Sequence, residues 1–496
     1  MVSPQPYTPE MPLSDLLCIA DRAHRDVMVT GIQIDSRKVQ AGDLFLALPG
    51  EHHDGREFIE QAVASGAIAV LAEPPVAGYV DELGVPLLEQ AELAQDVGVI
   101  ASKLYAQPSA ALHVVGITGT NGKTTTSWLT AQLARALGKS CGVIGTLGAT
   151  LGDEVGDAAN TTPDAVALQR QLSDWRDRAV FCVAMEVSSH ALVQGRVNGV
   201  SFETAVFTNL SRDHLDYHGT MAAYGRAKTQ LFSAPGPAHA VVNLDDDYSA
   251  QLLSVIDSDT RVLTYSAKGN SLADVVISEA AFHAGGVTAQ LHSPWGDGQF
   301  SSPLVGDFNL ANLAAAIASV ALMTDDFAGL LQAVAQLKTV PGRMQLVPNE
   351  LGVQLVVDYA HTPDALEHAL LALKPHVSGR MITVFGCGGD RDRGKRAIMG
   401  RIASDLSQLC LVTSDNPRGE NPMSILREIE SGCSGDYVLV VDRARAIAMA
   451  LREARAGDCI LVAGKGHEDY QIIQGERRHF SDVEQLQRAL TGGATA

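Results

Sequence analysis

The sequence predicts an α/β fold with parallel sheets, divided among three domains. Short apolar runs with strand character, such as Leu112–Ile117, Thr204–Phe207 and Met381–Phe385, alternate with helix-like segments. Because a helix that crosses over between two strands leaves them parallel, this alternation favours open parallel sheets covered by helices. The length of 496 residues fits three domains at roughly 150 residues per domain. Hydrophobic residues make up 46% of the chain and charged residues 19%, which is typical of a globular protein.

Three blocks set the predicted domain boundaries. Residues 1–109 predict a small α/β domain, because short apolar runs such as Asp43–Leu48 and Ala67–Leu71 are separated by Gly and Pro. Residues 110–340 alternate strand and helix patterns throughout and predict a central parallel sheet like that of P-loop ATPases. Residues 341–496 restart the alternation after the turn signal Pro341-Gly342 and predict a Rossmann-like domain.

Charge and composition exclude several classes of function. The net charge of −20 argues against a nucleic-acid partner held by a basic surface, although it reports the long-range field and not a local site. The uncharged stretch Phe308–Thr324 is rich in alanine and predicts a buried helix instead of a membrane span. Seven cysteines without a Cys-x-x-Cys pair, and no signal-peptide pattern in the first twenty residues, predict a cytoplasmic protein.

Residues 116–126 have the pattern of a phosphate-binding loop between a strand and a helix. Glycines allow the backbone amides to face phosphate oxygens, the helix N-terminus adds partial positive charge, and Lys123 reaches the outer phosphates. The Thr124 hydroxyl is then placed to bind Mg²⁺. The loop is a variant, because Ile117 stands where the usual pattern has its first glycine. An ordinary glycine-rich turn is the alternative, but the order of strand, loop, Lys-Thr and helix favours a nucleotide site.

Carboxylates and histidines follow the next strand-like runs. Glu186 comes directly after Val180–Met185, so we expect it at the carboxyl end of a strand, where it could hold Mg²⁺. His214 follows Thr204–Phe207, and on its own it would be interpreted as a structural histidine. For Asp245-Asp246-Asp247 a solvated turn is favoured over a metal site. The histidines of this region are not interpreted as a zinc site.

The loop Gly119–Thr125 resembles the ATP loop of the Mur ligase family, the ATP-dependent enzymes that form the amide bonds of the peptidoglycan stem peptide. Further blocks resemble the family in the same order along the chain: 185–190, 208–210, 213–219, 307–309, 341–343 and 358–363. The resemblance covers essentially the whole chain. It implies three domains, one each for a UDP-sugar, for ATP and for an incoming amino acid.

The resemblance also implies roles for individual residues around the nucleotide. ATP binding is implied for Gly119, Thr120, Asn121, Gly122, Lys123, Thr124, Thr125, Asn309, Arg343 and Asp358. Metal binding is implied for Thr124, Glu186, His214 and Lys228, the last as a carbamate that turns a cation into an anionic oxygen ligand. Catalytic roles are implied for Lys123, Glu186, His214, Lys228 and His361. Without the resemblance, Lys228 would be interpreted as a solvated lysine.

The N-terminal block Asp35-Ser36-Arg37, followed by Ala41–Phe45, resembles the family members that add the third residue of the stem peptide. The resemblance implies that UDP-MurNAc-L-Ala-D-Glu contacts Ile34, Ser36, Glu51, His52, His53, Asn160, Thr161, Thr162, Ser188, Gln194 and Arg196. Ser, Thr and Asn suit this role because they donate to and accept from peptide amides and carboxylates. For Glu51 alone, a polar turn is the alternative.

Asp415-Asn416-Pro417-Arg418 follows the strand-like Cys410–Thr413 and bears on the choice of amino acid. A guanidinium matches a carboxylate bidentately, and meso-diaminopimelate carries a carboxylate where lysine has only an ammonium group. Arg418 would therefore favour diaminopimelate and repel lysine. The tetrapeptide alone could also be a loop with a surface arginine. The resemblance implies diaminopimelate contacts for Arg391, Asp415, Asn416, Pro417, Arg418, Gly464 and Glu468.

The expected reaction is an ATP-driven ligation of meso-diaminopimelate to UDP-MurNAc-L-Ala-D-Glu through an acyl phosphate. A lysine-adding member of the family is the nearest alternative. A folate polyglutamate-type ligase would lack the 35–37 and 415–418 blocks, and a nucleotide-dependent switch or non-catalytic binding protein would not consume the substrates. Gly386-Cys387-Gly388-Gly389 is interpreted as a turn under the ligand site and not as a dinucleotide site. We expect a monomer with no membrane span.

Overall fold

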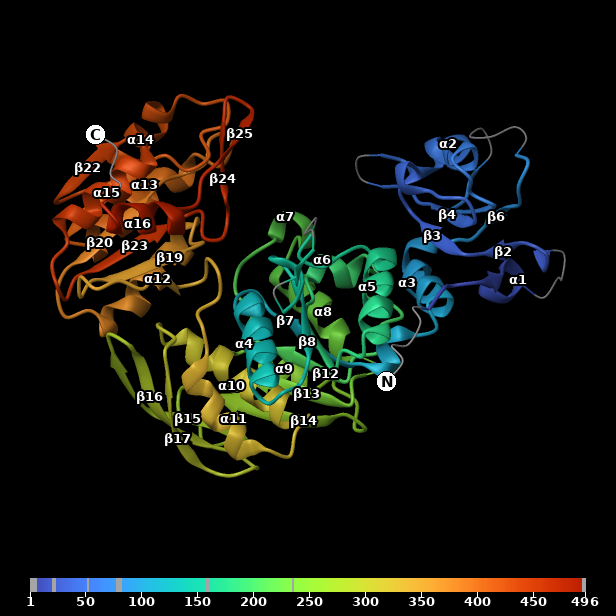
Figure 1. Cartoon of the computed structure of the whole chain (residues 1–496), viewed down its shortest axis with the longest axis horizontal. Helices are drawn as coiled ribbons and strands as arrows, with labels where there is room; N and C mark the ends of the chain where they lie inside the picture. Colours follow the sequence, from blue (N-terminus) through green and yellow to red (C-terminus); the bar gives the residue numbers. More distant parts are fainter. Residues whose placement is uncertain are drawn as a thin grey trace. The chain divides into compact units, whose positions relative to one another are not determined.

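The computed structural model describes residues 7–19, 24–50, 53–76, 83–152, 154–156, 160–233 and 236–492. The chain divides into two compact units. The first comprises the residues up to Tyr265 with Leu272–Asp274 and Ala315–Asp326, and the second comprises Ser266–Ser271, Val275–Ala314 and the residues from Phe327 onward. Helices alternate with parallel strands in both units (Figure 1), which confirms the predicted α/β class. The domain boundaries after residues 109 and 340 stay predictions.

The N-terminal part of the first unit contains a small parallel sheet in the order β3-β4-β5-β6. Its strands are β3 (Gly31–Gln33), β4 (Asp43–Ala47), β5 (Ala69–Ala72) and β6 (Leu87–Glu89). Both faces of β4 are buried: Leu44 and Leu46 pack with helix α3 (Leu93–Leu104), while Phe45 and Ala47 pack with helix α2 (Ile59–Ala64). The continuous apolar run of this strand therefore has a structural cause, because a helix covers each side. Before the sheet, β1 (Met11–Pro12) and β2 (Met28–Val29) form a short antiparallel pair beside helix α1 (Leu13–Leu16).

The rest of the first unit is built around a sheet in which strands run in the order β10-β9-β8-β11-β7-β12-β13-β14. Six are parallel: β7 (His113–Thr118), β8 (Cys141–Gly145), β11 (Cys182–Glu186), β12 (Thr204–Phe207), β13 (His239–Asn243) and β14 (Arg261–Ser266). The short strands β9 (Gly148–Leu151) and β10 (Glu154–Val155) add antiparallel pairs. Because β7 lies between β11 and β12, the loops that follow these three strands meet at one edge of the sheet.

Helices accompany these strands in the order of the chain. They are α4 (Lys123–Ala136), α5 (Ala165–Asp177), α6 (Ser189–Val193), α7 (Leu215–His218), α8 (Met221–Thr229) and α9 (Ser249–Leu253). Helix α5 lies beside α3 (Figure 1). Helix α4 begins directly after the predicted phosphate loop and ends at Ala136. The order of strand, loop and helix is therefore the one the sequence predicted.

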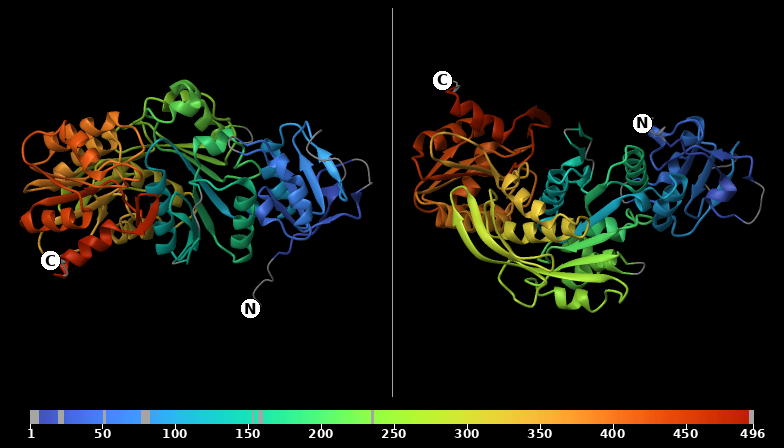
Figure 2. Two further views of the ribbon diagram at one scale, coloured as in Figure 1. Left: turned by 90° about the horizontal axis from the view of Figure 1, so that it is seen from above. Right: turned by 60° about the horizontal axis from the view of Figure 1, so that its bottom comes forward.

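The second unit begins with a feature that differs from the predicted strand–helix alternation. Strands β15 (Val275–His283), β16 (Gly286–His292) and β17 (Gly298–Ser302) form an antiparallel meander, whose long strands are visible in the right view of Figure 2. The connections between these strands are too short for a crossover helix, so only antiparallel pairing is possible. Helix α10 (Phe308–Ala321) follows, and its buried Leu313 and Ile317 confirm the predicted buried helix.

The C-terminal sheet has the strand order β18-β19-β23-β20-β21-β22. Apart from the antiparallel β18 (Gln345–Leu346), its strands are parallel: β19 (Gln354–Asp358), β20 (Met381–Phe385), β21 (Leu409–Thr413), β22 (Tyr437–Val440) and β23 (Cys459–Ala463). Strands β20 and β21 confirm the predicted apolar runs Met381–Phe385 and Cys410–Thr413, with ends that differ by at most one residue.

Helices cover both faces of this sheet. One face packs against α12 (Pro363–Leu373), α13 (Gly394–Leu406) and α14 (Pro422–Glu430), and the other against α15 (Arg443–Glu453) and α16 (Asp482–Leu490). Helix α11 (Phe327–Ala333) precedes the sheet, and the hairpin β24 (Tyr470–Ile473) and β25 (Glu476–His479) follows β23. The loops after β19, β20, β21 and β23 lie at one edge. No helix in the described ranges is long and apolar enough to cross a membrane.

Candidate active site

The predicted phosphate loop forms the turn between β7 and α4. Gly119 has a φ of +151°, and a Cβ there would lie 1.8 Å from the Thr208 hydroxyl oxygen, so only glycine fits this close approach. The loop is tied to the segment after β12, because Asn121 N–H donates to Asn209 Oδ1 at 2.9 Å and Thr208 Oγ1 donates to the Asn121 carbonyl at 2.6 Å. The loop also contains Thr120 and Gly122, and Thr125 lies in the first turn of α4.

Two lysines converge on the carbonyl of Gly119. Lys123 Nζ donates to the Gly119 and Thr120 carbonyls at 2.9 Å each, and Lys228 Nζ donates to the Gly119 carbonyl at 2.7 Å. Lys228, on α8, is only 1% exposed, so it is not the solvated lysine that would be expected without the family resemblance. Burial and the nearby Lys123 charge lower the pKa of Lys228 well below its ordinary value. This amine therefore loses its proton much more readily than a surface lysine.

Glu186 ends β11 and is buried beside the first turn of α4. Thr124 Oγ1 donates to Glu186 Oε2 at 2.9 Å, and Thr146 N–H donates to Glu186 Oε1 at 2.8 Å. Gly145 makes room for this carboxylate, because a Cβ on Gly145 would lie 2.1 Å from Oε1. The hydroxyl and carboxylate that the sequence predicted as metal ligands are thus in direct contact. Their oxygens are the hard donors that Mg²⁺ prefers.

His214 is the residue that precedes helix α7, at its N-terminus. It has a φ of +52°, and its side chain is 45% exposed. Its ring lies 4.8 Å from that of His190 and 6.0 Å from that of Tyr224, measured between centroids. In the described part of the chain, no group of three or more His, Cys, Asp or Glu side chains is arranged to hold a metal ion. The metal-binding role of His214 stays a prediction.

Five of the residues implied for the peptide substrate form a connected cluster at the end of β11. Thr162 Oγ1 accepts from Ser188 N–H at 3.1 Å, and Arg196 Nη1 donates to the Thr162 carbonyl at 3.1 Å. Arg196 also donates to Gln194 Oε1, while Thr161 Oγ1 lies 3.2 Å from the Thr146 hydroxyl. The sixth residue, Asn160, is exposed and directly precedes Thr161 in the sequence. These groups are donors and acceptors suited to a peptide.

The residues implied for the uridine end belong to the small N-terminal sheet. Ser36 begins the short helix η2 (Ser36–Lys38) and donates to Gln61 Oε1 at 3.1 Å. Ile34 is half-buried after β3, and His53 is exposed before the helix η3 (Gly55–Phe58). Glu51 and His52 lie outside the described residues. The individual uridine contacts stay predictions.

The triple-aspartate segment forms a turn after β13, as favoured by the sequence. Asp246 is half-buried and accepts from Leu210 N–H at 2.9 Å and from Tyr248 N–H at 3.0 Å. Its carboxylate therefore holds the segment after β12 in place. This is a structural task that the sequence pattern did not reveal.

In the second unit, the loops after β20 and β21 are packed together. A Cβ on Gly386 would lie 2.2 Å from the Thr413 carbonyl oxygen, and one on Gly389 would lie 2.0 Å from that of Pro417. Arg418 has a φ of +51° and donates through Nη1 to the Gly389 carbonyl at 2.9 Å. A non-glycine residue in this conformation is uncommon and often marks a functional loop. Arg391 is exposed in the loop after β20.

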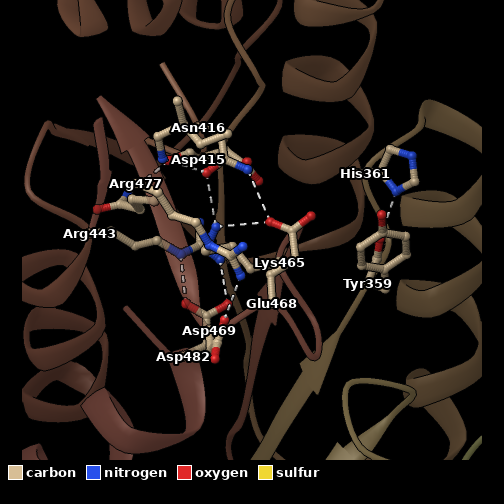
Figure 3. Close-up of polar contacts among 12 residues, drawn as sticks. Tyr359, His361, Asp415, Asn416, Arg443, Lys465, Glu468, Asp469, Arg477 and Asp482 are labelled. Carbon is tan, nitrogen blue, oxygen red and sulfur yellow. Dashed lines mark hydrogen bonds and ion pairs between the residues drawn. The ribbon is translucent and has the colours of Figure 1, made fainter. Parts of the chain in front are cut away.

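Figure 3 shows the polar groups that meet beside these loops. Asn416 Nδ2 donates to Glu468 Oε2 at 3.0 Å, and Lys465 Nζ lies 3.1 Å from the same oxygen. Asp415 is buried, and a Cβ on Gly464 would lie 2.6 Å from Asp415 Oδ2. The structure therefore brings together Asp415, Asn416, Gly464 and Glu468 of the predicted amino-acid site.

A fully buried ion pair underlies the same loops. Arg443 donates to both carboxylate oxygens of Asp482 at 2.7 Å each, and neither side chain is exposed to solvent. Arg443 Nη2 also donates to the carbonyl of Ala463 at 2.9 Å. Because Ala463 is the last residue of β23, the ion pair fixes the point from which the Gly464–Glu468 loop departs.

The remaining predicted nucleotide residues lie in the second unit. Asn309, on α10, is buried and donates to the Val305 carbonyl at 2.7 Å. Asp358 ends β19 and accepts from Met344 N–H at 2.7 Å, and burial raises the pKa of its carboxyl. The Arg343 guanidinium lies over the Tyr359 ring at 4.7 Å. His361 is exposed, with Nδ1 2.9 Å from the Tyr359 carbonyl oxygen (Figure 3).

Sequence reasoning missed several residues that hold these sites. Thr146, Thr208 and Asn209 position the phosphate loop and Glu186, and Lys465, Arg443 and Asp482 lie under the amino-acid loops. Lys465 had a local signal, since it stands between two glycines directly after an apolar strand, and Thr208 and Asn209 stood in the block 208–210 that resembles the family. The others contact their partners across long sequence separations, which no local pattern encodes.

Three descriptions of known families match consecutive parts of the chain. They are the Mur ligase family catalytic domain over residues 28–101, the Mur ligase middle domain over 117–320, and the Mur ligase glutamate ligase domain over 342–466. The matches succeed one another as the three predicted domains do.

Curated relatives and solved structures agree with these family matches. UDP-N-acetylmuramoyl-L-alanyl-D-glutamate--2,6-diaminopimelate ligase from Pseudomonas aeruginosa is 45% identical over 97% of this chain and 98% of its own, and that from Coxiella burnetii is 43% identical over 96% and 99%. A solved structure of an enzyme of this name has a TM-score of 0.76 at 37% identity, covering 98% of this chain and 99% of its own. MurF from Acinetobacter baumannii, at 19% identity, TM-score 0.65 and coverage of 99% and 100%, shares the fold. The chain belongs to the Mur ligase family.

Proposed function

We propose that this protein is an ATP-dependent ligase that joins meso-diaminopimelate to UDP-MurNAc-L-Ala-D-Glu, a step of peptidoglycan precursor synthesis. The relatives that match nearly the whole chain at 43–45% identity carry the name of this activity. The observation that carries the choice of acceptor is the loop Asp415–Arg418, whose guanidinium lies beside Asn416 and Gly388. Such a cation matches the second carboxylate of diaminopimelate and repels the side-chain ammonium of lysine.

The reaction needs a leaving group, because a carboxylate is a poor electrophile. The side-chain carboxylate of the D-glutamate attacks the γ-phosphorus of ATP, ADP departs, and an acyl phosphate forms. The amine of diaminopimelate then attacks the acyl carbon, the bond to the phosphate oxygen breaks, and the amine releases its proton. Lys123 would exchange its contacts with the Gly119 and Thr120 carbonyls for contacts with phosphate oxygens. Its charge would then offset the charge on the transferring phosphoryl group.

Mg²⁺ is the metal that the donor atoms fit, and Thr124 and Glu186 would hold it. When bound, it would supply neutralisation of phosphate charge. The hydrogen bonds from Thr146 keep the Glu186 carboxylate oriented toward Thr124. Asn309, Arg343, Asp358 and His361 are proposed to serve ATP and the reacting groups, as the family resemblance implies.

Carbamylation of Lys228 is part of the proposal. Only the neutral amine adds CO₂, and burial lowers the pKa of this amine, so its reactive form is more populated than that of a surface lysine. The test is ¹³C NMR of the protein in ¹³C-bicarbonate: the wild type should give a carbamate signal that Lys228→Ala lacks. An identical spectrum for both proteins would remove the carbamate from the proposal.

The acceptor specificity is tested by phosphate release with meso-diaminopimelate or L-lysine, in the wild type and in Arg418→Ala. We expect the wild type to use diaminopimelate, and the variant to need roughly 10- to 100-fold more of it, since a hydrogen bond to a charged group is lost. Arg427→Ala removes an exposed arginine of the same unit and is the matched control. A wild type that uses lysine and not diaminopimelate would favour the lysine-adding alternative.

A cytoplasmic location and a monomeric state complete the proposal. All seven cysteines are free, which suits a reducing compartment. Light scattering after gel filtration tests the oligomeric state, with a single species of one chain expected.

A further inference from the structure

Lys465 is a lysine with no solvent-exposed surface, in the loop that follows β23. Its Nζ lies 3.2 Å from Asn416 Oδ1 and 3.1 Å from Glu468 Oε2 (Figure 3). We propose that Lys465 is a positioning residue for the amino-acid substrate: it fixes the orientation of the Asn416 amide and of the Glu468 carboxylate. The inference rests on the proposed function, because it assigns these two side chains to the acceptor.

The first step of the argument concerns the Asn416 amide. The two ends of an amide have almost the same shape, so hydrogen bonds alone decide which end points where. Asn416 Oδ1 accepts from Lys465 Nζ and from Ile472 N–H, the latter at 3.0 Å. With two donors at the oxygen, the NH₂ group must face the other way, and it donates to Glu468 Oε2. Lys465 therefore contributes to choosing one of two possible amide orientations.

The second step concerns the Glu468 carboxylate. Its Oε2 accepts from both Lys465 and Asn416, whereas its Oε1 accepts no hydrogen bond from any described residue. The side chain of Glu468 remains 18% exposed, while that of Lys465 is fully enclosed. Oε2 is thus held by two donors, and Oε1 is left for a ligand. An ammonium group, which diaminopimelate carries at each end, is the natural partner for that oxygen.

The third step concerns charge. A partly buried charge is stabilised by an opposite charge close to it. Lys465 Nζ forms an ion pair with Glu468 Oε2 at 3.1 Å, and this pair holds the carboxylate in the position from which it can recognise an ammonium. Because no surface of Lys465 is exposed, the lysine acts through Asn416 and Glu468 and does not itself touch the substrate.

The backbone keeps Lys465 in place. Gly464 has a φ of +118°, a conformation that favours glycine, and its missing Cβ leaves space for the carboxylate of Asp415. The Tyr470 ring lies 5.4 Å from Lys465 Nζ and closes another side of the amine. The lysine is therefore held between the two loops that the predicted amino-acid site uses.

The test compares steady-state constants for each substrate in the wild type, in Lys465→Met, and in Lys374→Met, which removes an exposed lysine of the same unit. Lys465→Met should raise KM for meso-diaminopimelate roughly tenfold or more, since two charged hydrogen bonds are lost. KM for ATP and for UDP-MurNAc-L-Ala-D-Glu should stay within about twofold. In a background of Asn416→Ala with Glu468→Gln, adding Lys465→Met should change KM for diaminopimelate by less than about twofold.

Each other outcome has a defined meaning. An unchanged KM for diaminopimelate in folded Lys465→Met would overturn the inference, and so would an equal rise in all three KM values. Lys465→Arg keeps the charge and the donors, and it should restore KM for diaminopimelate at least in part. If both variants fail to fold, Lys465 is a folding residue and the inference is wrong. A wild type that does not use diaminopimelate would overturn the proposed function, whatever the variants do.

Discussion

The phosphate loop and the amino-acid loops both contain buried or half-buried cations, but the cations have different partners. Beside the phosphate loop, Lys123 and Lys228 donate to backbone carbonyls. Beside the amino-acid loops, Lys465 and Arg443 are paired with the carboxylates of Glu468 and Asp482. A carbonyl is a neutral partner that a phosphate oxygen can replace, whereas a buried carboxylate holds its cation firmly. The first region is thus arranged to meet an anionic ligand and the second to hold a fixed geometry.

The largest effect on activity should come from removing a cation beside the phosphate loop. Lys123→Ala should lower kcat for phosphate release by about 10²- to 10³-fold or more, because charge on the transferring phosphoryl group loses its partner. Lys139→Ala, which removes an exposed lysine soon after α4, is the matched control and should keep its rate. A folded Lys123→Ala protein with the wild-type rate would contradict the difference drawn between the two regions.

Removing the carboxylate partner of a cation beside the amino-acid loops should affect stability first. Asp482→Asn leaves the Arg443 charge buried without its carboxylate, and breaking a buried pair costs about 3–5 kcal/mol of unfolding free energy. Urea unfolding followed by circular dichroism measures it. Glu484→Gln, which breaks the exposed pair with Arg488, should cost less than about 1 kcal/mol. Equal losses in the two variants would show that burial of the first pair is irrelevant.

A smaller and pH-dependent effect should arise at Glu420. The fully buried Arg396 lowers the pKa of Glu420 from 4.5 to about 2. Because the folded pKa lies below the unfolded one, the stabilisation is present above pH 4.5 and is lost as the pH falls toward 2. Glu420→Gln should therefore lower the melting temperature at pH 7 and reduce its fall between pH 5 and pH 3. A variant whose melting profile parallels that of the wild type would exclude this ion pair as a source of acid sensitivity.

The sequence predicted those features that local patterns encode. The phosphate loop, the strands that precede Glu186 and Asp415, and the buried helix α10 all lie where the alternation of apolar and polar residues indicated. Strand and helix periodicity is a property of neighbouring residues, so it can be read from a single sequence.

Other features depend on contacts between distant residues. Without the family resemblance, Lys228 would be interpreted as a solvated lysine. In the structure it is buried on α8 and donates to the Gly119 carbonyl. The meander β15–β17 replaced the expected alternation, because its short turns permit only antiparallel pairing. The pairing of Arg443 with Asp482 joins the starts of two helices, α15 and α16, and no spacing rule predicts it. Such contacts are set by tertiary packing, which sequence periodicity does not determine.

The central claim is the identity of the bond that this protein makes. The most direct measurement is mass spectrometry of the product after incubation with ATP, UDP-MurNAc-L-Ala-D-Glu, and equal concentrations of meso-diaminopimelate and L-lysine. We predict a UDP-linked tripeptide that contains diaminopimelate, formed together with equimolar ADP and phosphate. A product that contains lysine, or ATP hydrolysis without any tripeptide, would contradict the account.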